Sequence, residues 1–400
     1  MEPVDHLDDD AARVSGRLGN PKGGSVLLVS ADTIDKWASE AASKADIGWL
    51  IRRLIKATCI DCRCVDFYDG SQVYWSGYDG IVECEGYQRI VPAGRSVWEL
   101  STDQKVGRKA TADFNGRSGE PLGEDTRVTA FVAATARKWA ARRDWCSDRR
   151  AEQKWREVSA VDAVVLETWL EDAPGIANDF AQRYLDRGVD ELRSGDAIWD
   201  SYTNSAFYLS GKQLPGRFVI AGRGTTLDGI SQWLVRARAQ HAGFILPMYG
   251  PTALEIAHFV CAAAALLDED DTGYASSLIW IKSAQAIPAL ATLAPGHIVL
   301  AEAAVGVEIS RVVARRRCSA ILMHECAEEP NLAHLAGAGR APETLYLPRA
   351  SEEQWIRELC LLGMDAERAA NAWRAAAADY AQFCSQSAAV GLYGLGRDCK

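Results

Sequence analysis

The stretch from Trp75 to Arg117 constrains the fold of this 400-residue chain more than any other segment. It contains two short apolar runs typical of β-strands, DGIVEC at 79–84 and RSVWELS at 95–101. A connection containing Gly and Pro joins them, and a charged segment that favours a helix follows at about 103–117. We therefore expect a β-hairpin followed directly by a helix.

Acidic and basic side chains hold defined positions in this hairpin and helix. Asp79 opens the first strand, and Glu99 lies within the second. Alternation along the second strand puts Glu99 on the face opposite Trp98, so the acid can face a site while the tryptophan packs in a core. Lys105 and Lys109 lie four residues apart and share one face of the helix.

This order of groups suits the hydrolysis of a phosphodiester. Such hydrolysis uses a metal ion to polarise the phosphoryl oxygen and activate water. Mg²⁺ and Mn²⁺ take oxygen ligands, usually one or two carboxylates with retained waters. We predict that Asp79 and Glu99 bind this ion, and that Lys109 or Lys105 stabilises charge on the phosphate. The alternative is a plain turn aspartate at 79 and a solvated strand residue at 99.

The sequence motif YDGIV…VPAG.SVWELST…K…KA..DF..R in this stretch resembles that of the PD-(D/E)XK, or restriction-endonuclease-like, superfamily. Within it, the stretch is similar to a bacterial group whose nuclease-like domain leads a multidomain chain of defence function. The resemblance implies that Asp79 is the first acid and Glu99 the second. It departs at Ser101, where the usual lysine stands, and so implies a lysine moved to the following helix. Lys109 is preferred over Lys105 because it belongs to the KA..DF..R run.

The function implied by this resemblance is an endonuclease that cleaves nucleic acid, DNA in preference, in bacterial anti-phage defence. Two alternatives stay open because the strand lysine is missing. The chain could be a catalytically inactive scaffold, or it could be a regulatory sensor that binds a nucleotide or another small anion.

The charge of the chain bears on the expected nucleic-acid partner. The formal net charge of −10 is not typical of a general nucleic-acid binder. Residues 101–150, however, carry 11 Lys and Arg against 7 Asp and Glu. This excess directly follows the expected site, where a phosphate backbone needs neutralising. A solvated basic surface is the alternative.

The 11 cysteines follow no regular framework, and we expect free thiols in a cytoplasmic protein. Cys59, Cys62, Cys64 and Cys84 could supply four thiolates to zinc, but their spacing differs from that of paired structural sites. We therefore prefer buried or free thiols. No apolar run reaches the length of a membrane span, so we expect no membrane partner.

The expected organisation is a flexible leader at 1–23, the nuclease-like domain at 24–190, a polar linker at 191–215 and a second α/β domain at 216–400. The run SVLLVS at 25–30 could be a strand. In the second domain strands and helices alternate, which predicts a doubly wound parallel sheet with trailing helices. Its first predicted strand is RFVIAG, directly after the linker.

The second domain resembles a STAND or AAA-type P-loop ATPase domain, in degenerate form. The segment LPMYGPTALE at 246–255 stands where G-x-x-x-x-G-K-[ST] is expected, yet it has no lysine and ends in Glu255. We therefore expect no ATP. The turn at 220–226 could instead cradle an anion, although a plain turn is preferred. We expect this half to sense a trigger, bind a partner protein or self-assemble, and the abrupt end at 391–400 is consistent with a missing downstream region.

Overall fold

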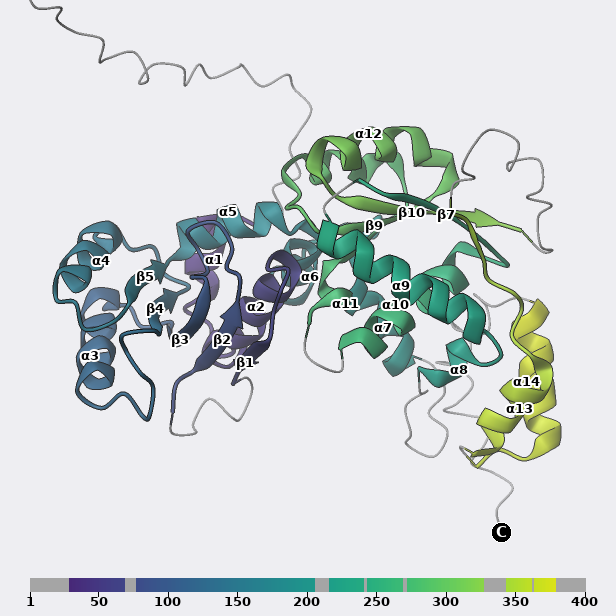
Figure 1. The fold of residues 1–400 in the computed structure, drawn as a ribbon, viewed down its shortest axis with the longest axis horizontal. Coiled ribbons are helices and arrows are strands. Elements are labelled where there is room, and N and C mark those ends of the chain that lie inside the picture. The colour runs from purple at the N-terminus through teal and green to yellow at the C-terminus, as the bar shows by residue number, and fades with distance from the viewer. Residues whose placement is uncertain are drawn as a thin grey trace, which may run out of the picture.

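The computed structural model describes residues 29–68, 77–205, 216–240, 243–268, 272–326, 343–361 and 363–378. These residues form two β-sheets, each flanked by helices (Figure 1), so the predicted α/β class is confirmed. The leader expected at 1–23 lies outside the described residues, and so does most of the strand expected at 25–30.

The first sheet has five strands in the order β1-β2-β3-β4-β5. They are β1 (Cys64–Phe67), β2 (Gly80–Cys84), β3 (Gly94–Ser101), β4 (Ala130–Thr135) and β5 (Glu157–Val161). The first three strands are antiparallel, and β3, β4 and β5 are parallel. The predicted hairpin is therefore the β2–β3 pair, in which Gly80 lies opposite Trp98.

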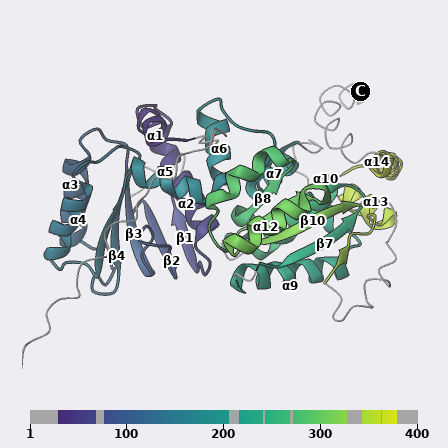
Figure 2. The ribbon, with the colours of Figure 1, turned by 90° about the horizontal axis from the view of Figure 1, so that it is seen from above.

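Helices cover both faces of this sheet. One face carries α1 (Ala31–Trp37), α2 (Ser43–Thr58), α5 (Ala163–Asp172) and α6 (Pro174–Tyr184), and the other carries α3 (Val106–Gly119) and α4 (Arg142–Ala151). Trp98 is buried in the core on the α2 side, whereas Val97 is buried with Phe114 of α3 on the other. Alternation along β3 therefore puts Glu99 on the face opposite Trp98, as predicted, and that face is the one covered by α3. Figures 1 and 2 both show α3 and α4 at the end of the molecule farthest from the second sheet.

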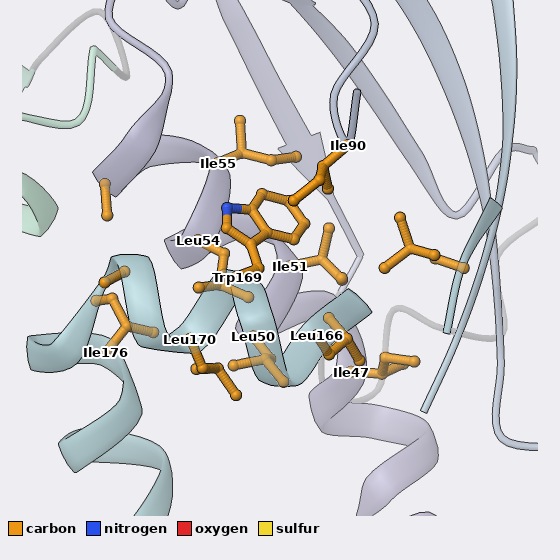
Figure 3. Packing of buried hydrophobic residues seen from close by; sticks show 14 of the residues in the cluster. Ile47, Leu50, Ile51, Leu54, Ile55, Ile90, Leu166, Trp169, Leu170 and Ile176 are labelled. Atoms are coloured by element: carbon orange, nitrogen blue, oxygen red, sulfur yellow. The ribbon is translucent and has the colours of Figure 1, made fainter. Parts of the chain in front are cut away.

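The core between α2 and α5 supports one face of this hairpin. Apolar residues of α2 recur with helical spacing at Ile47, Leu50, Ile51, Leu54 and Ile55, and all are buried. Figure 3 shows them facing Trp169 of α5. The indole nitrogen of this tryptophan donates a hydrogen bond to Thr58 Oγ1 at 3.0 Å, so its one polar atom is satisfied inside the core.

The second sheet has six strands in the order β11-β7-β10-β9-β8-β6. They are β6 (Leu192–Ser194), β7 (Ile245–Gly250), β8 (Leu278–Ile281), β9 (Ile298–Glu302), β10 (Ser319–Glu325) and β11 (Leu345–Tyr346). All pairs are parallel except β6 with β8. The parallel sheet expected in this half is therefore present, with one antiparallel strand at its edge.

Helices lie on both faces of the second sheet, as expected for strands buried on two sides. One core contains residues of α7 (Gly195–Ser205), α8 (Arg217–Ile220), α9 (Gly224–Gln240), α10 (Ala253–Leu267) and α11 (Tyr274–Ser277). The opposite core contains residues of the 3₁₀ helix η3 (Ala284–Thr292) and of α12 (Gly306–Arg316), with the short η4 (Ala303–Val305) between them. The trailing helices are α13 (Glu352–Leu361) and α14 (Ala366–Ala378).

Two expectations for this half were wrong. The RFVIAG segment forms the helix α8 instead of a strand, because Phe218 and Val219 pack into the helical core, where the Phe218 ring lies 4.1 Å from that of Trp355. The segment 191–215, expected as a linker, contains β6 and α7 in its described part. Leu192 is fully buried in the second core, so the second sheet begins inside this segment.

Polar contacts join the two halves. Arg238 of α9 donates hydrogen bonds to the backbone carbonyls of Lys56 and Cys59, at 2.7 and 2.8 Å. Arg53 of α2 donates to Asp200 of α7 at 3.0 Å. The end of α2 is thus bound from two directions by the second half.

Candidate functional site

Asp79 and Glu99 meet at one end of the β2–β3 hairpin. Asp79 directly precedes β2, and its Oδ2 accepts the backbone N–H of Leu100 at 2.7 Å. Because Leu100 follows Glu99 in β3, this bond fixes the position of the first acid relative to the second. The Glu99 residue is only 7% exposed.

Burial and like charge both act on this acid pair. Removal from water raises the pKa of Glu99 to about 7, and the neighbouring Asp79 charge adds to the shift. The pKa of Asp79 is also raised by burial, and the Leu100 N–H and the Lys109 charge oppose that rise. A buried Glu99 whose pKa is raised by the neighbouring half-buried Asp79 forms a pair of carboxylates that is a candidate cation site.

Helix α3 brings three charged side chains to these acids. Lys109, Asp113 and Arg117 follow one another in steps of four and so lie along one helical face. The Arg117 guanidinium donates from Nε to Glu99 Oε1 and from Nη2 to the Gly77 carbonyl. It also lies 4.9 Å from the centre of the Tyr78 ring.

The predicted lysines occupy different places. Lys109 lies close enough to lower the pKa of Asp79, but its ammonium pairs with Asp113 Oδ1 at 2.5 Å. Lys105 precedes α3 and is exposed, and its backbone N–H is donated to Asp103 at 2.6 Å. Within the described residues, the basic group that directly contacts Glu99 is Arg117.

Arg117 is the site residue that the sequence analysis quoted but did not assign. Its signal was the spacing of the KA..DF..R run, in which positions 109, 113 and 117 share a helical face. Ser101, at the position of the usual lysine, pairs in register with Thr135 of β4. That part of the sheet therefore presents two hydroxyl-bearing residues in place of an amine.

The two acids line separate hollows. Asp79 borders a cleft of about 180 Å³ with Tyr68, Gly77 and Glu124. Glu99 borders a smaller hollow with Ser101, Asp113 and Thr135, among others. Arg117 contacts Glu99 of the second hollow and the carbonyl of Gly77, which lines the first. This side chain therefore links the two hollows and holds the Glu99 carboxylate.

The chemistry of the acid pair fits a hard divalent cation. Asp79 Oδ1 and Glu99 Oε2 have no hydrogen-bond partner within the described part of the chain, whereas Oδ2 and Oε1 are used by Leu100 and Arg117. In that same part, no group of three or more His, Cys, Asp or Glu is arranged to hold a metal ion. The protein would thus supply two carboxylates, and waters would complete the coordination, as is usual for Mg²⁺.

The turn after β7, where a phosphate loop was sought, is filled by the protein's own acids. The N–H of Ala253, at the start of α10, is donated to Glu325 Oε1 at 3.0 Å. Glu255 pairs with the buried Arg223. A carboxylate therefore occupies the helix end that would bind a phosphate in a P-loop.

A comparison with models of known protein families gave no match, and a search of curated proteins gave none either. Among the described helices, none combines the length and the apolar character needed to cross a bilayer.

Proposed function

We propose that the first half is a metal-dependent endonuclease that hydrolyses phosphodiester bonds of nucleic acid, DNA in preference. The observation that supports the proposal is the convergence of two carboxylates at the end of the β2–β3 hairpin, the buried Glu99 and the half-buried Asp79. Arg117 pairs with Glu99 Oε1, but Asp79 Oδ1 and Glu99 Oε2 keep no protein partner among the described residues, and a cation is a suitable partner for these two oxygens.

Each residue of the site has a proposed role. Asp79 and Glu99 would hold Mg²⁺ or Mn²⁺ through Oδ1 and Oε2, and such an ion would supply Lewis-acid activation of the phosphate and of water. Lys109 lies beside the acids and stabilises negative charge on the phosphoryl group. Arg117 positions Glu99 through its Nε hydrogen bond.

Exposed arginines near the site support a nucleic-acid partner. Arg108 on α3 and Arg143 on α4 are exposed and make no ion pair among the described residues. Such arginines can contact a phosphate backbone. Contacts of this kind position the nucleic acid but do not read its sequence.

A catalytically inactive scaffold is the second candidate function. The observation that favours it is the bond from Arg117 to Glu99, together with Ser101 where an amine is usual. In this alternative, the arginine replaces the metal ion as the partner of the acid.

The deciding experiment measures metal binding and DNA cleavage together. Wild-type protein, Asp79→Asn and Glu99→Gln are titrated with Mn²⁺ by calorimetry and incubated with plasmid DNA and Mg²⁺ or Mn²⁺. Glu157→Gln is the matched control, because Glu157 is an exposed glutamate of the same sheet. We expect Mn²⁺ binding and cleavage in the wild type and the control, and loss of both in the site variants.

Two results would count against the endonuclease. If the wild type binds no Mn²⁺ and cleaves no DNA, the chain is a catalytically inactive scaffold. If cleavage survives both substitutions, the catalytic centre lies elsewhere. Circular dichroism of each variant establishes that the fold is kept.

The proposed setting in anti-phage defence rests on the sequence resemblance. It is tested by expressing the wild type and Glu99→Gln in a bacterial host and measuring phage plating. A reduction in plaques that requires Glu99 is expected, and equal plaque numbers with both proteins would contradict it.

A further inference from the structure

A cavity of about 290 Å³ lies where the two halves of the chain meet, apart from the acid pair. Helices α5 and α6 of the first half form one wall, and β6 and η3 of the second half form the other. Figures 1 and 2 both show α6 between the two sheets. The volume is close to the lower end of the range of about 300–1,000 Å³ found for small-molecule sites, so the cavity suits a compact ligand.

The walls of this cavity are largely apolar and come from two hydrophobic cores. Leu170 and Ala177 belong to the core on the α2 side of the first sheet, and Leu192 and Ala286 belong to the core between the second sheet and η3. All four are at most 8% exposed, so the packing around them holds them in place. The walls are therefore preformed, and they suit the apolar body of a ligand.

Hydrogen bonds join the two walls. Thr292 Oγ1 of η3 donates to the Glu171 carbonyl of α5 at 2.5 Å. Asn178 of α6 donates from Nδ2 to the carbonyls of Val189 and Leu192, at 3.1 and 2.7 Å. Because hydroxyl, amide and carbonyl groups make these bonds, they fix the walls without neutralising a charge at the cavity.

The charge at the cavity is negative. Among the described residues that line it, the charged ones are Glu171 and Glu191, and neither forms an ion pair within the described part of the chain. Burial raises the pKa of Glu171, and the like charges of Glu167 and Asp172 add to the rise. Burial lowers the pKa of Lys282, and the charge of Glu191 opposes that shift, so Glu191 already faces a cation. Glu171 is thus the carboxylate that an added cation would complement.

We propose that this cavity binds a small ligand made of an apolar body and a protonated amine, with the amine paired to Glu171. The apolar body packs against Leu170 and Leu192, one from each half, and the ammonium donates hydrogen bonds to the carboxylate. Anionic ligands are disfavoured, because they would meet acids of like charge. The site is separate from Asp79 and Glu99 and does not depend on the proposed nuclease activity.

The two halves supply one wall each, so the ligand contacts both at once. It binds the folded chain and not the unfolded one. The unfolding temperature should therefore rise with the concentration of the ligand.

The test uses the full chain and three probes of similar size, compared by ligand-detected NMR and by thermal unfolding. They are phenethylamine, which is protonated at neutral pH, the uncharged phenethyl alcohol and the anionic phenylacetate. We expect the amine to bind with a dissociation constant on the order of 1 mM, which suits a ligand of so few atoms. The alcohol should bind about fivefold more weakly, and phenylacetate should not bind in the same range.

Two variants locate the bound amine. Glu171→Gln keeps the shape of the side chain and removes its charge, so amine binding should weaken about fivefold while alcohol binding is unchanged. Ala289→Phe fills the cavity from the half-buried Ala289 of η3 and should abolish binding of both probes. Glu308→Gln is the control, because Glu308 is an exposed glutamate of α12 outside the lining. Circular dichroism establishes that each variant keeps its fold.

The proposal is wrong if the wild type does not bind the amine, or if phenylacetate binds as tightly as the amine does. It is also wrong if either Glu171→Gln or Ala289→Phe binds the amine like the wild type. In that case the amine either binds elsewhere on the protein or binds without the carboxylate.

Discussion

At the residue scale, the chemistry of the acid pair is controlled by Arg117, which sequence analysis did not assign. The sequence pattern pointed to lysine, because the superfamily that this stretch resembles has a lysine beside its two acids. The structure instead places a guanidinium on Glu99, since α3 presents one residue every four toward the strand. Asp79 and Glu99 were predictable because alternation and strand order fix which face an acid occupies. The partner across the helix was not, because it depends on how α3 packs.

Removal of the Glu99 charge should flatten the pH dependence of stability. The pKa of Glu99 is about 7 in the folded protein against 4.5 in the unfolded chain, so the folded state binds more protons between these values. Stability therefore falls as pH rises from 4.5 to 7. We expect Glu99→Gln to gain on the order of 2–3 kcal/mol relative to wild type between pH 5 and pH 8. Urea unfolding at the two pH values measures this.

Mn²⁺ provides the control for that measurement. A cation at the acid pair should restore wild-type stability at pH 8 and leave Glu99→Gln unchanged. A wild type whose unfolding free energy is the same at pH 5 and pH 8 would show that Glu99 titrates normally and that the pair is not strained.

In contrast to Glu99→Gln, which should stabilise the protein at high pH, loss of Arg117 should destabilise it. Arg117→Met leaves the buried Glu99 without its paired cation, so we expect a cost of about 1–3 kcal/mol at pH 8. The cost should shrink at pH 5, where Glu99 is protonated. Arg127→Met is the matched control, because Arg127 forms an exposed pair with Asp125. Equal costs for the two variants would mean that the Glu99 contact contributes nothing.

At the element scale, the strands and helices with strong periodicity were predicted, and those set by tertiary packing were not. The hairpin and the helices α3, α9 and α10 follow their patterns. RFVIAG has the composition of a strand, yet Phe218 is buried against Trp355 and the segment is helical. The strand β1 was not predicted, because it has only four residues and begins within the cysteine-rich segment.

At Gly48 of α2, too, tertiary packing outweighs the preference that the sequence alone indicates. A glycine inside a helix costs up to about 1 kcal/mol relative to alanine, so propensity alone favours Gly48→Ala. In the structure an added Cβ would lie 2.3 Å from the backbone oxygen of Tyr68. We therefore expect Gly48→Ala to destabilise the protein by about 1–3 kcal/mol, because the helix must move from the end of β1.

Gly116 of α3 is the matched helical glycine, since an added Cβ there meets no atom within 4 Å. Gly116→Ala should stabilise the protein by about 0.5–1 kcal/mol. Chemical denaturation of both variants measures whether each substitution raises or lowers the free energy of unfolding. A stabilising effect of both alanines would show that α2 and β1 are not in close contact.

At the scale of the whole molecule, the end of α2 connects the two sheets. Gly273, before α11, approaches Lys56 so closely that a Cβ would lie 2.5 Å from its carbonyl oxygen. Arg238 binds across the same contact. Neither feature has a sequence signature, because Arg238 lies 182 positions and Gly273 lies 217 positions from Lys56.

The last prediction concerns this connection. Arg238→Met removes three hydrogen bonds and leaves the Lys56, Cys59 and Gly273 carbonyls without their donor, so we expect a loss of about 3–5 kcal/mol. Arg236→Met, two residues away, breaks only an exposed pair with Glu343 and should cost less than about 1 kcal/mol. If the halves depend on each other, thermal unfolding of the wild type is one transition and that of Arg238→Met is two. An Arg238→Met profile identical to that of Arg236→Met would instead mean that the halves are held together by apolar packing, with the buried arginine contributing little.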